Sequence, residues 1–212
     1  MEKRLFDTPW PELPYDYLVG IYGDYPRPEE KIKYLVHKGD LIRVKRGLYV
    51  LSPQYGKLIS TYVLAEMIYW PSYISMHSAL KFYGLIPEAV FGVIGVTTKR
   101  PCSQVTPFGN FTYHRSSLHE FLWGLRLDFI DQHRQVRVAS PLKALFDLIR
   151  FNVVNYGRRS DQDLFEYIEL MRIDFEDFTI TRSDLEGLKS SRSKRIREFL
   201  LQMISHYQLE IT

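Results

Sequence analysis

Three basic side chains crowd the approach to a glycine within residues 35–53, which read LVHKGDLIRVKRGLYVLSP. Arg43, Lys45 and Arg46 precede Gly47, and runs of Val, Ile, Leu and Tyr lie on both sides. Lys and Arg contact the phosphates of nucleic acid, and a glycine lets the chain turn sharply beside a duplex. The residue types therefore indicate phosphate contact. The alternative is an ordinary hairpin whose exposed edges carry basic residues against aggregation.

The residues around this basic cluster alternate as β-strands do. A turn at the Arg-Gly step would join two strands within residues 41–51 and place four side chains on one face: Ile42, Val44, Tyr49 and Leu51. We expect Val44 and Tyr49 to be buried on the side facing Leu35, because a slip of one residue would reverse both faces.

The same register makes two further predictions about the hairpin. Arg43 and Lys45 should face solvent, since they alternate with the buried side chains. Gly47 should adopt a positive φ angle or approach the DNA backbone closely, because other residues are strained in that conformation.

A helix with a basic and aromatic outer face is predicted just before the hairpin. The segment YPRPEEKIKYLVHKGD has Pro28 at the first helical position, acidic residues in the first turn and a glycine at the exit. On a helical wheel Ile32, Leu35 and Val36 share one face, and the opposite face carries Glu30, Lys33, Tyr34, His37 and Lys38. A shorter helix is expected within residues 15–24.

Helix, turn, strand, basic tip and strand is the element order of a winged helix-turn-helix, in which a helix enters the major groove and the hairpin lies along the backbone. Residues 27–46 hold seven basic and three acidic residues, whereas the whole chain has a formal net charge of only +3. We therefore expect double-stranded DNA as a partner. The candidate contacts are Arg27, Lys31, Lys33, Tyr34, His37 and Lys38 from the helix, and Arg43, Lys45, Arg46 and Gly47 from the hairpin.

The rest of the chain predicts a second, mixed region. Strands are expected at residues 90–97, 111–113, 125–130 and 136–139, and helices at 58–70, near 76–84 and from Ser140 onward. In the tail, Ser183 and Glu186 fit a capping box. The fold class is thus α+β: a winged helix-turn-helix domain at 1–55, then a mixed α/β domain at 56–212 with a helical tail from about 158.

Composition limits the classes of protein that the chain could be. Its 212 residues are 45% hydrophobic, which is enough for a real core. The sequence has no apolar run of membrane-spanning length and no signal-peptide pattern, so we expect a cytoplasmic protein without membrane contact. Cys102 is the single cysteine, so neither a disulfide nor a structural zinc site is expected. No metal or other cofactor is expected.

Common catalytic motifs are also absent from the sequence, so we do not expect an enzyme. One alternative is a DNA-targeted, metal-dependent nuclease. Asp128 precedes a segment that loosely resembles the acid-x-Lys element of restriction-type nucleases, but that element reads Gln135-Val136-Arg137 and lacks the second carboxylate that a magnesium site needs.

Four segments together resemble the AbiEi-type antitoxins of bacterial type IV toxin–antitoxin and phage-defence systems. They read KGDLIRVKRGLYVLSP, PSYISMHSALKFYGLIPE, VIGVTTKR and VASPLKALFDLI, and the similarity extends over about residues 15–150. The Arg-Gly-Leu-Tyr wing of the family falls on residues 46–49, and a second block falls on residues 72–88.

This resemblance implies a transcriptional autorepressor that binds its own operator through an N-terminal winged helix. It also implies antagonism of a nucleotidyltransferase-like toxin without a stable complex. Residues 151–212 hold no block that resembles the family, so a solitary defence-associated regulator, or a scaffold without antitoxin activity, stays open. The apolar stripe of the terminal helix fits internal packing, and a homodimer on DNA is compatible with it.

Overall fold

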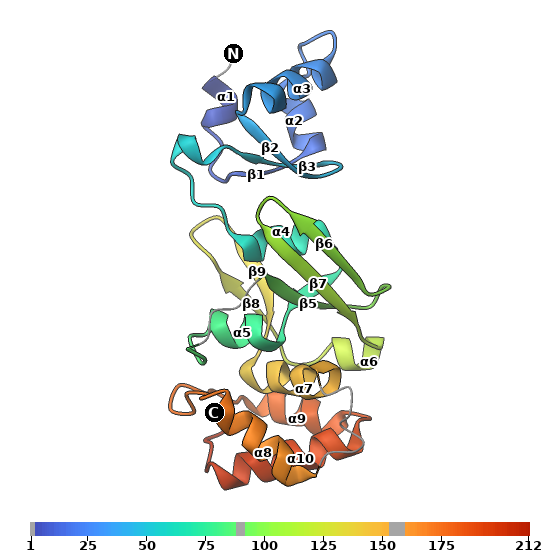
Figure 1. Cartoon of the computed structure of the whole chain (residues 1–212), viewed down its shortest axis with the longest axis vertical. Coiled ribbons are helices and arrows are strands. Elements are labelled where there is room, and N and C mark those ends of the chain that lie inside the picture. Colours follow the sequence, from blue (N-terminus) through green and yellow to red (C-terminus); the bar gives the residue numbers. More distant parts are fainter. Residues whose placement is uncertain (1–2, 88–91, 153–159) are drawn as a thin grey trace.

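The computed structural model describes residues 3–87, 92–152 and 160–212. The N-terminal elements pack beside a three-stranded antiparallel sheet with the order β1-β3-β2 (Figure 1). In chain order they are α1 (Lys3–Phe6), β1 (Glu12–Pro14), α2 (Tyr15–Ile21), α3 (Pro28–Lys38), β2 (Leu41–Lys45), β3 (Leu48–Leu51) and the 3-10 turn η1 (Pro53–Tyr55). The short helix expected within residues 15–24 is α2, which ends at Ile21. Strand β1 was not predicted.

The second region is built on a mixed six-stranded sheet with the order β6-β7-β5-β4-β9-β8. Its elements are α4 (Thr61–Ile68), β4 (Ser72–Ile74), α5 (Met76–Phe82), β5 (Val93–Thr97), β6 (Cys102–Thr106), β7 (Gly109–Arg115), α6 (Leu118–Phe121), β8 (Leu125–Phe129), β9 (Gln135–Ala139) and α7 (Pro141–Asn152). The tail adds α8 (Asp161–Leu170), α9 (Arg182–Ser190) and α10 (Lys194–His206). This architecture confirms the expected α+β class, although β4 and β6 were not predicted and residues 90 and 91 lie outside the described residues.

The N-terminal sheet is buried on both faces, which corrects the predicted hairpin register. Ile42 pairs with Val50 and Arg43 pairs with Tyr49, and the register shifts between Arg43 and Lys45. Tyr49 packs against the N-terminal core, whereas Val44 belongs to the core of the second region. The prediction that Val44 and Tyr49 share a face was wrong because an irregularity in β2 interrupts the alternation.

An ion pair joins the N-terminal sheet to the second region. Glu12 in β1 is almost fully buried, and its two carboxylate oxygens accept bonds from Nη1 of Arg134 at 2.8 and 3.0 Å. The backbone N–H of Ser60 donates to the same carboxylate at 2.9 Å. Arg134 also binds Asp131 within its own turn. The buried carboxylate is therefore well satisfied, which favours one placement of the two regions.

Helix α7 lies between the six-stranded sheet and the tail helices (Figure 1). It carries a fully buried ion pair. Nζ of Lys143 lies 3.0 Å from Oδ1 of Asp147, and both side chains are completely buried. Asp147 also accepts hydrogen bonds from Tyr73 of β4 at 2.8 Å and from Ser75, which precedes α5, at 2.7 Å. The aspartate thus ties α7 to the central strand of the sheet.

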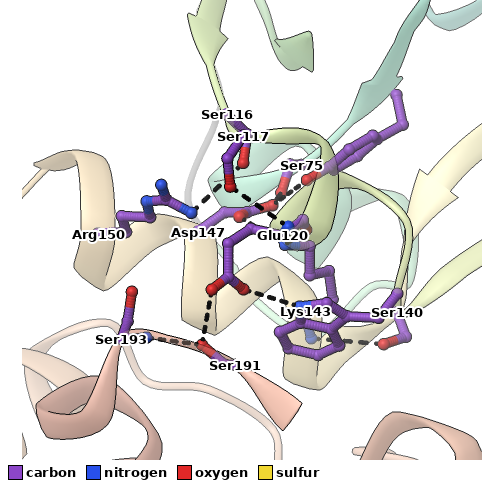
Figure 2. A network of polar contacts seen from close by, with 12 residues as sticks. Ser75, Ser116, Ser117, Glu120, Ser140, Lys143, Asp147, Arg150, Ser191 and Ser193 are labelled. Atoms are coloured by element: carbon purple, nitrogen blue, oxygen red, sulfur yellow. Dashed lines mark hydrogen bonds and ion pairs between the residues drawn. The ribbon is translucent and has the colours of Figure 1, made fainter. Parts of the chain in front are cut away.

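The same network reaches the tail through Glu120 of α6 (Figure 2). Nζ of Lys143 donates to the backbone carbonyl of Glu120 at 2.6 Å. The Glu120 carboxylate in turn accepts from Trp123 at 3.1 Å, from Ser191 at 3.1 Å and from the backbone N–H of Arg192 at 2.9 Å. Sheet, α6, α7 and the connection between α9 and α10 are therefore joined by one buried set of polar contacts.

The tail corrects one further prediction. Helix α9 begins with a capping box formed by Thr181 and Asp184, and not by Ser183 and Glu186. A β-bridge pairs Ile180 with Ile211, and the backbone N–H of Arg182 donates to the carbonyl of Thr212. The extended chain therefore stops at Thr181, and the helix starts there.

Within residues 3–87, 92–152 and 160–212, no helix combines the length and the apolar character needed to cross a bilayer.

We expect Lys143→Met to lower the free energy of unfolding by about 3–5 kcal/mol, because it leaves the buried charge of Asp147 without its cation. A matched control is Lys194→Met, which removes another i,i+4 pair whose partners are mostly exposed. That variant should lose at most about 0.5 kcal/mol. Urea unfolding at neutral pH measures both, and equal losses would contradict the buried pair's importance.

Acid should destabilise the protein partly through Glu120. Burial alone would raise the pKa of this carboxyl, but bonds from Trp123, Arg192 and Ser191 and the charge of Lys143 outweigh it and lower the pKa. The unfolded chain then binds more protons, so stability is present above the ordinary pKa of 4.5 and falls as pH drops through the folded pKa. Glu120→Gln should be less stable at pH about 7 and should show a shallower acid slope, by up to about 1.4 kcal/mol per pH unit. The free energies of unfolding of wild type and Glu120→Gln are measured in urea across this pH range. If the two change in parallel with pH, the prediction is wrong.

Candidate nucleic-acid interface

Helix α3 begins and ends where the sequence predicted. Pro28 occupies the first turn with Glu29 and Glu30, and Gly39 closes the helix in the left-handed conformation at φ 84°. The backbone N–H of Gly39 donates to the carbonyl of Val36 at 3.1 Å, and that of Asp40 donates to the carbonyl of Leu35 at 2.9 Å. These local signals fix the length of the helix and so its outward side chains.

The two faces of α3 also match the prediction. Ile32 and Leu35 are buried in the N-terminal core, whereas the opposite face is exposed: Lys33, Tyr34, His37 and Lys38. Tyr34 has 52% of its surface exposed. Arg27, at the position before the helix, is exposed as well.

Lys31 and Lys33 are held in different ways on this helix. Nζ of Lys31 lies 5.1 Å from the ring centre of Tyr34 and 5.8 Å from that of Tyr25, so two aromatic faces support the charge. Lys33 forms an ion pair with Glu30 at 2.8 Å, which raises the pKa of the lysine. Both partners of that pair are largely exposed, so it contributes little and can give way to a phosphate.

Lys38 at the end of α3 is tied to the buried Asp40. The ion pair measures 2.9 Å, and Asp40 also accepts hydrogen bonds from Tyr55 and from Gln54 of the η1 turn. Burial would raise the pKa of Asp40, but the bonds from Tyr55 and Lys38 outweigh it and lower the pKa. Lys38 therefore anchors the helix end, and it is less available to a ligand than Lys33.

The hairpin tip has the conformation that the sequence predicted. Gly47 has a φ angle of 83°, and its carbonyl accepts a hydrogen bond of 2.9 Å from the backbone N–H of Tyr15. A Cβ atom at this position would meet nothing within 4 Å, so only the backbone conformation favours glycine. The tip is thereby fixed against the start of α2.

Helix and hairpin tip border one basic cavity. Its cations are Lys33 from α3, Arg43 from β2 and Arg46 from the tip; the other lining residues are Tyr15, Glu29, Ile32, Gly47 and Tyr49. Arg43 and Arg46 are exposed, as expected. The structure thus gathers part of the predicted set in one concave surface, while Arg27, His37 and Lys38 lie along α3 outside that cavity.

The prediction that Lys45 faces solvent was wrong. Its Nζ donates to the backbone carbonyl of Ile68, at 2.5 Å, at the C-terminal end of α4. Burial and the nearby charge of Lys99 lower the pKa of this lysine, although Cys102 opposes them. The end of a helix carries partial negative charge and attracts a cation. The register shift in β2 therefore directs Lys45 to the second region.

Sequence reasoning missed a second basic cavity in the six-stranded region. Lys99, Arg100 and Arg115 line it together with Tyr69 and Thr98. Nζ of Lys99 donates to the carbonyl of residue 70 at 2.7 Å and lies 5.8 Å from the ring centre of Tyr69. The sequence signal was weak, because β5 and β7 bring these residues together from separate segments.

The residues of the nuclease alternative are arranged differently from a metal site. Asp128 accepts a hydrogen bond of 2.6 Å from the hydroxyl of Tyr83, and Gln135 lies at the start of β9. In the part of the chain that the structure describes, no three His, Cys, Asp or Glu residues cluster as metal ligands would.

Comparison with known proteins adds no family assignment. No protein-family model and no curated protein matches the chain.

Gly47→Val should lower the free energy of unfolding by about 1–2 kcal/mol, because a β-branched residue is strained at positive φ. Gly20→Ala in α2 is the matched control, since that glycine has open space and an ordinary φ angle. The control should be neutral or stabilising. Amide exchange of β7 should be unchanged in both, which would place the strain at the tip; loss of protection in β7 would contradict a local effect.

Proposed function

We propose that the protein is a DNA-binding transcriptional regulator whose N-terminal elements act as a winged helix-turn-helix. The observation that carries the proposal is the shared basic cavity of α3 and the hairpin tip, which joins Lys33 with Arg43 and Arg46. A duplex offers phosphates on both sides of its major groove, so a helix and a hairpin with converging cations fit it.

Helix α3 and the hairpin would contact different parts of the duplex. Tyr34 and His37 stand on the exposed face of α3, where side chains reach base edges when the helix lies in the major groove. Arg43 and Arg46 project from the hairpin, whose tip suits contact with the phosphate backbone. Lys45, although it lies between them in sequence, would not take part, because its charge is already bound at the end of α4.

The wing is tested by two neighbouring substitutions. Arg46→Ala should weaken specific and non-specific duplexes about equally and should lower the salt slope by about one. Lys45→Ala is the matched control and should leave that slope unchanged. Binding is measured on operator and scrambled duplexes across a salt series, with the operator first selected from a random duplex pool. A lower slope for Lys45→Ala, or none for Arg46→Ala, would contradict the assignment.

The reading helix is tested by the same titration with Tyr34→Ala and His37→Ala. Each base-reading side chain should cost about 1–3 kcal/mol on the operator with little loss on scrambled DNA. If these variants weaken all duplexes uniformly while the wing variants change sequence preference, the roles are reversed. If wild-type protein binds no duplex at physiological salt, DNA binding itself is refuted.

The resemblance to AbiEi-type proteins extends this proposal to autorepression and to antagonism of a nucleotidyltransferase-like toxin, without a stable complex between them, in the cytoplasm. The sequence blocks at residues 46–49 and 72–88 support it. Co-expression with the product of an adjacent nucleotidyltransferase-like gene tests the antitoxin activity. Rescue of growth supports that part, and continued growth arrest leaves a regulator alone.

A further inference from the structure

Strand β8 is one of the two border strands of the six-stranded sheet, and it carries exposed apolar side chains. Leu127 and Phe129 are 60% and 66% exposed. Leu58, which borders a cavity together with Phe129, is 83% exposed. β8 contains no proline, and it follows one side of the sheet in Figure 1. Open strand edges with apolar side chains are sites for pairing with another chain.

The register on β9 fixes which backbone groups of β8 point outward. Ser140 donates to the carbonyl of Gly124 at 2.7 Å, and the N–H of Ile130 donates to Arg134 at 2.8 Å. Antiparallel pairs alternate, so residues 126 and 128 exchange hydrogen bonds with β9. The N–H and C=O groups of Leu125, Leu127 and Phe129 therefore point away from the sheet, and no backbone partner for them occurs among the described residues.

The sequence of β8, LRLDF, is complementary to itself in an antiparallel pair. A two-fold axis through Leu127 places Leu125 opposite Phe129 of the other copy and each Leu127 opposite its equivalent. The same axis places Arg126 opposite Asp128 of the other copy, so opposite charges meet at both positions. Within its own chain Arg126 forms an ion pair with Asp184 at 3.2 Å and donates to Thr179, and Asp128 accepts a bond from Tyr83. A guanidinium has five donors and a carboxylate about four acceptor positions, so the contacts between copies would add to these bonds and need not replace them.

The other border strand, β6, lacks these features. Pro101 and Pro107 flank it, and its residues are CSQVT, with Val105 as the one exposed large apolar side chain. Prolines and polar residues are common protections of a strand edge. The contrast shows that β8 and β6 are not equivalent edges of this sheet.

We propose that β8 is a self-pairing edge, through which two copies of the chain form a two-fold dimer with a continuous sheet. The outward backbone groups can pair with any strand, whereas the apolar pairs and the reciprocal Arg126–Asp128 pairs favour a second copy over an unrelated strand. This proposal does not depend on DNA binding. If the dimer also binds DNA, its symmetry matches a palindromic operator.

Leu127→Lys tests the edge, because it places like charges opposite each other on the two-fold axis. Sedimentation of the full chain over a wide concentration range should show a wild-type dimer whose dissociation constant rises by about tenfold or more in this variant. Val105→Lys, on the protected edge, is the matched control and should dimerise like wild type. A monomeric wild type, or equal association of all three proteins, would overturn the proposal.

Cysteine cross-linking tests the register and does not depend on how well Leu127→Lys folds. In a Cys102→Ser background, Leu127→Cys should form a disulfide between two copies on mild oxidation, since paired strands bring the Cα atoms within about 5.5 Å. Leu125→Cys and Phe129→Cys should cross-link when mixed with each other, and not alone. Cross-links that form equally with Val105→Cys, or none at residue 127, would refute the β8 pair.

Discussion

The fully buried ion pair between Lys143 and Asp147 is the contact on which the second region depends most. Removing two charges from water costs desolvation free energy. The attraction within the pair offsets this cost only because each partner also has further hydrogen bonds. Asp147 accepts bonds from Tyr73 of β4 and from Ser75, and Lys143 donates to the backbone of α6. Through Glu120 the network continues to Ser191 and Arg192, which connect α9 to α10. The helical tail is therefore part of the sheet's support and not an appendage.

The basic surface of the N-terminal elements rests on a different kind of support. Local signals shape α3 and the hairpin tip, whereas the buried Glu12–Arg134 pair and the bond from Lys45 hold them against the second region. The first set determines which side chains face outward. The second set determines how that face is oriented. The residues that line the basic cavity all belong to the N-terminal elements.

Local chemistry in the sequence predicted the elements that local chemistry controls. Pro28 and Gly39 marked the limits of α3, and the Arg-Gly step predicted the positive φ angle of Gly47. The irregularity in β2 was missed because alternation assumes an unbroken register. Lys45 was therefore expected in solvent, although its partner lies 23 residues along the chain at the end of α4. Strand β1 was missed because three residues beside prolines become a strand only through pairing with β3.

The hydrogen bond from Lys45 couples the end of α4 to the conformation of the hairpin. Any molecule that binds the second region and displaces the end of α4 must also change the energy of the hairpin conformation that Lys45 stabilises. Such a coupling is reciprocal, so a duplex held by the hairpin would alter the affinity for that molecule by the same factor. If the proposed surface binds DNA, the one lysine that turns away from it would couple DNA binding to events in the second region.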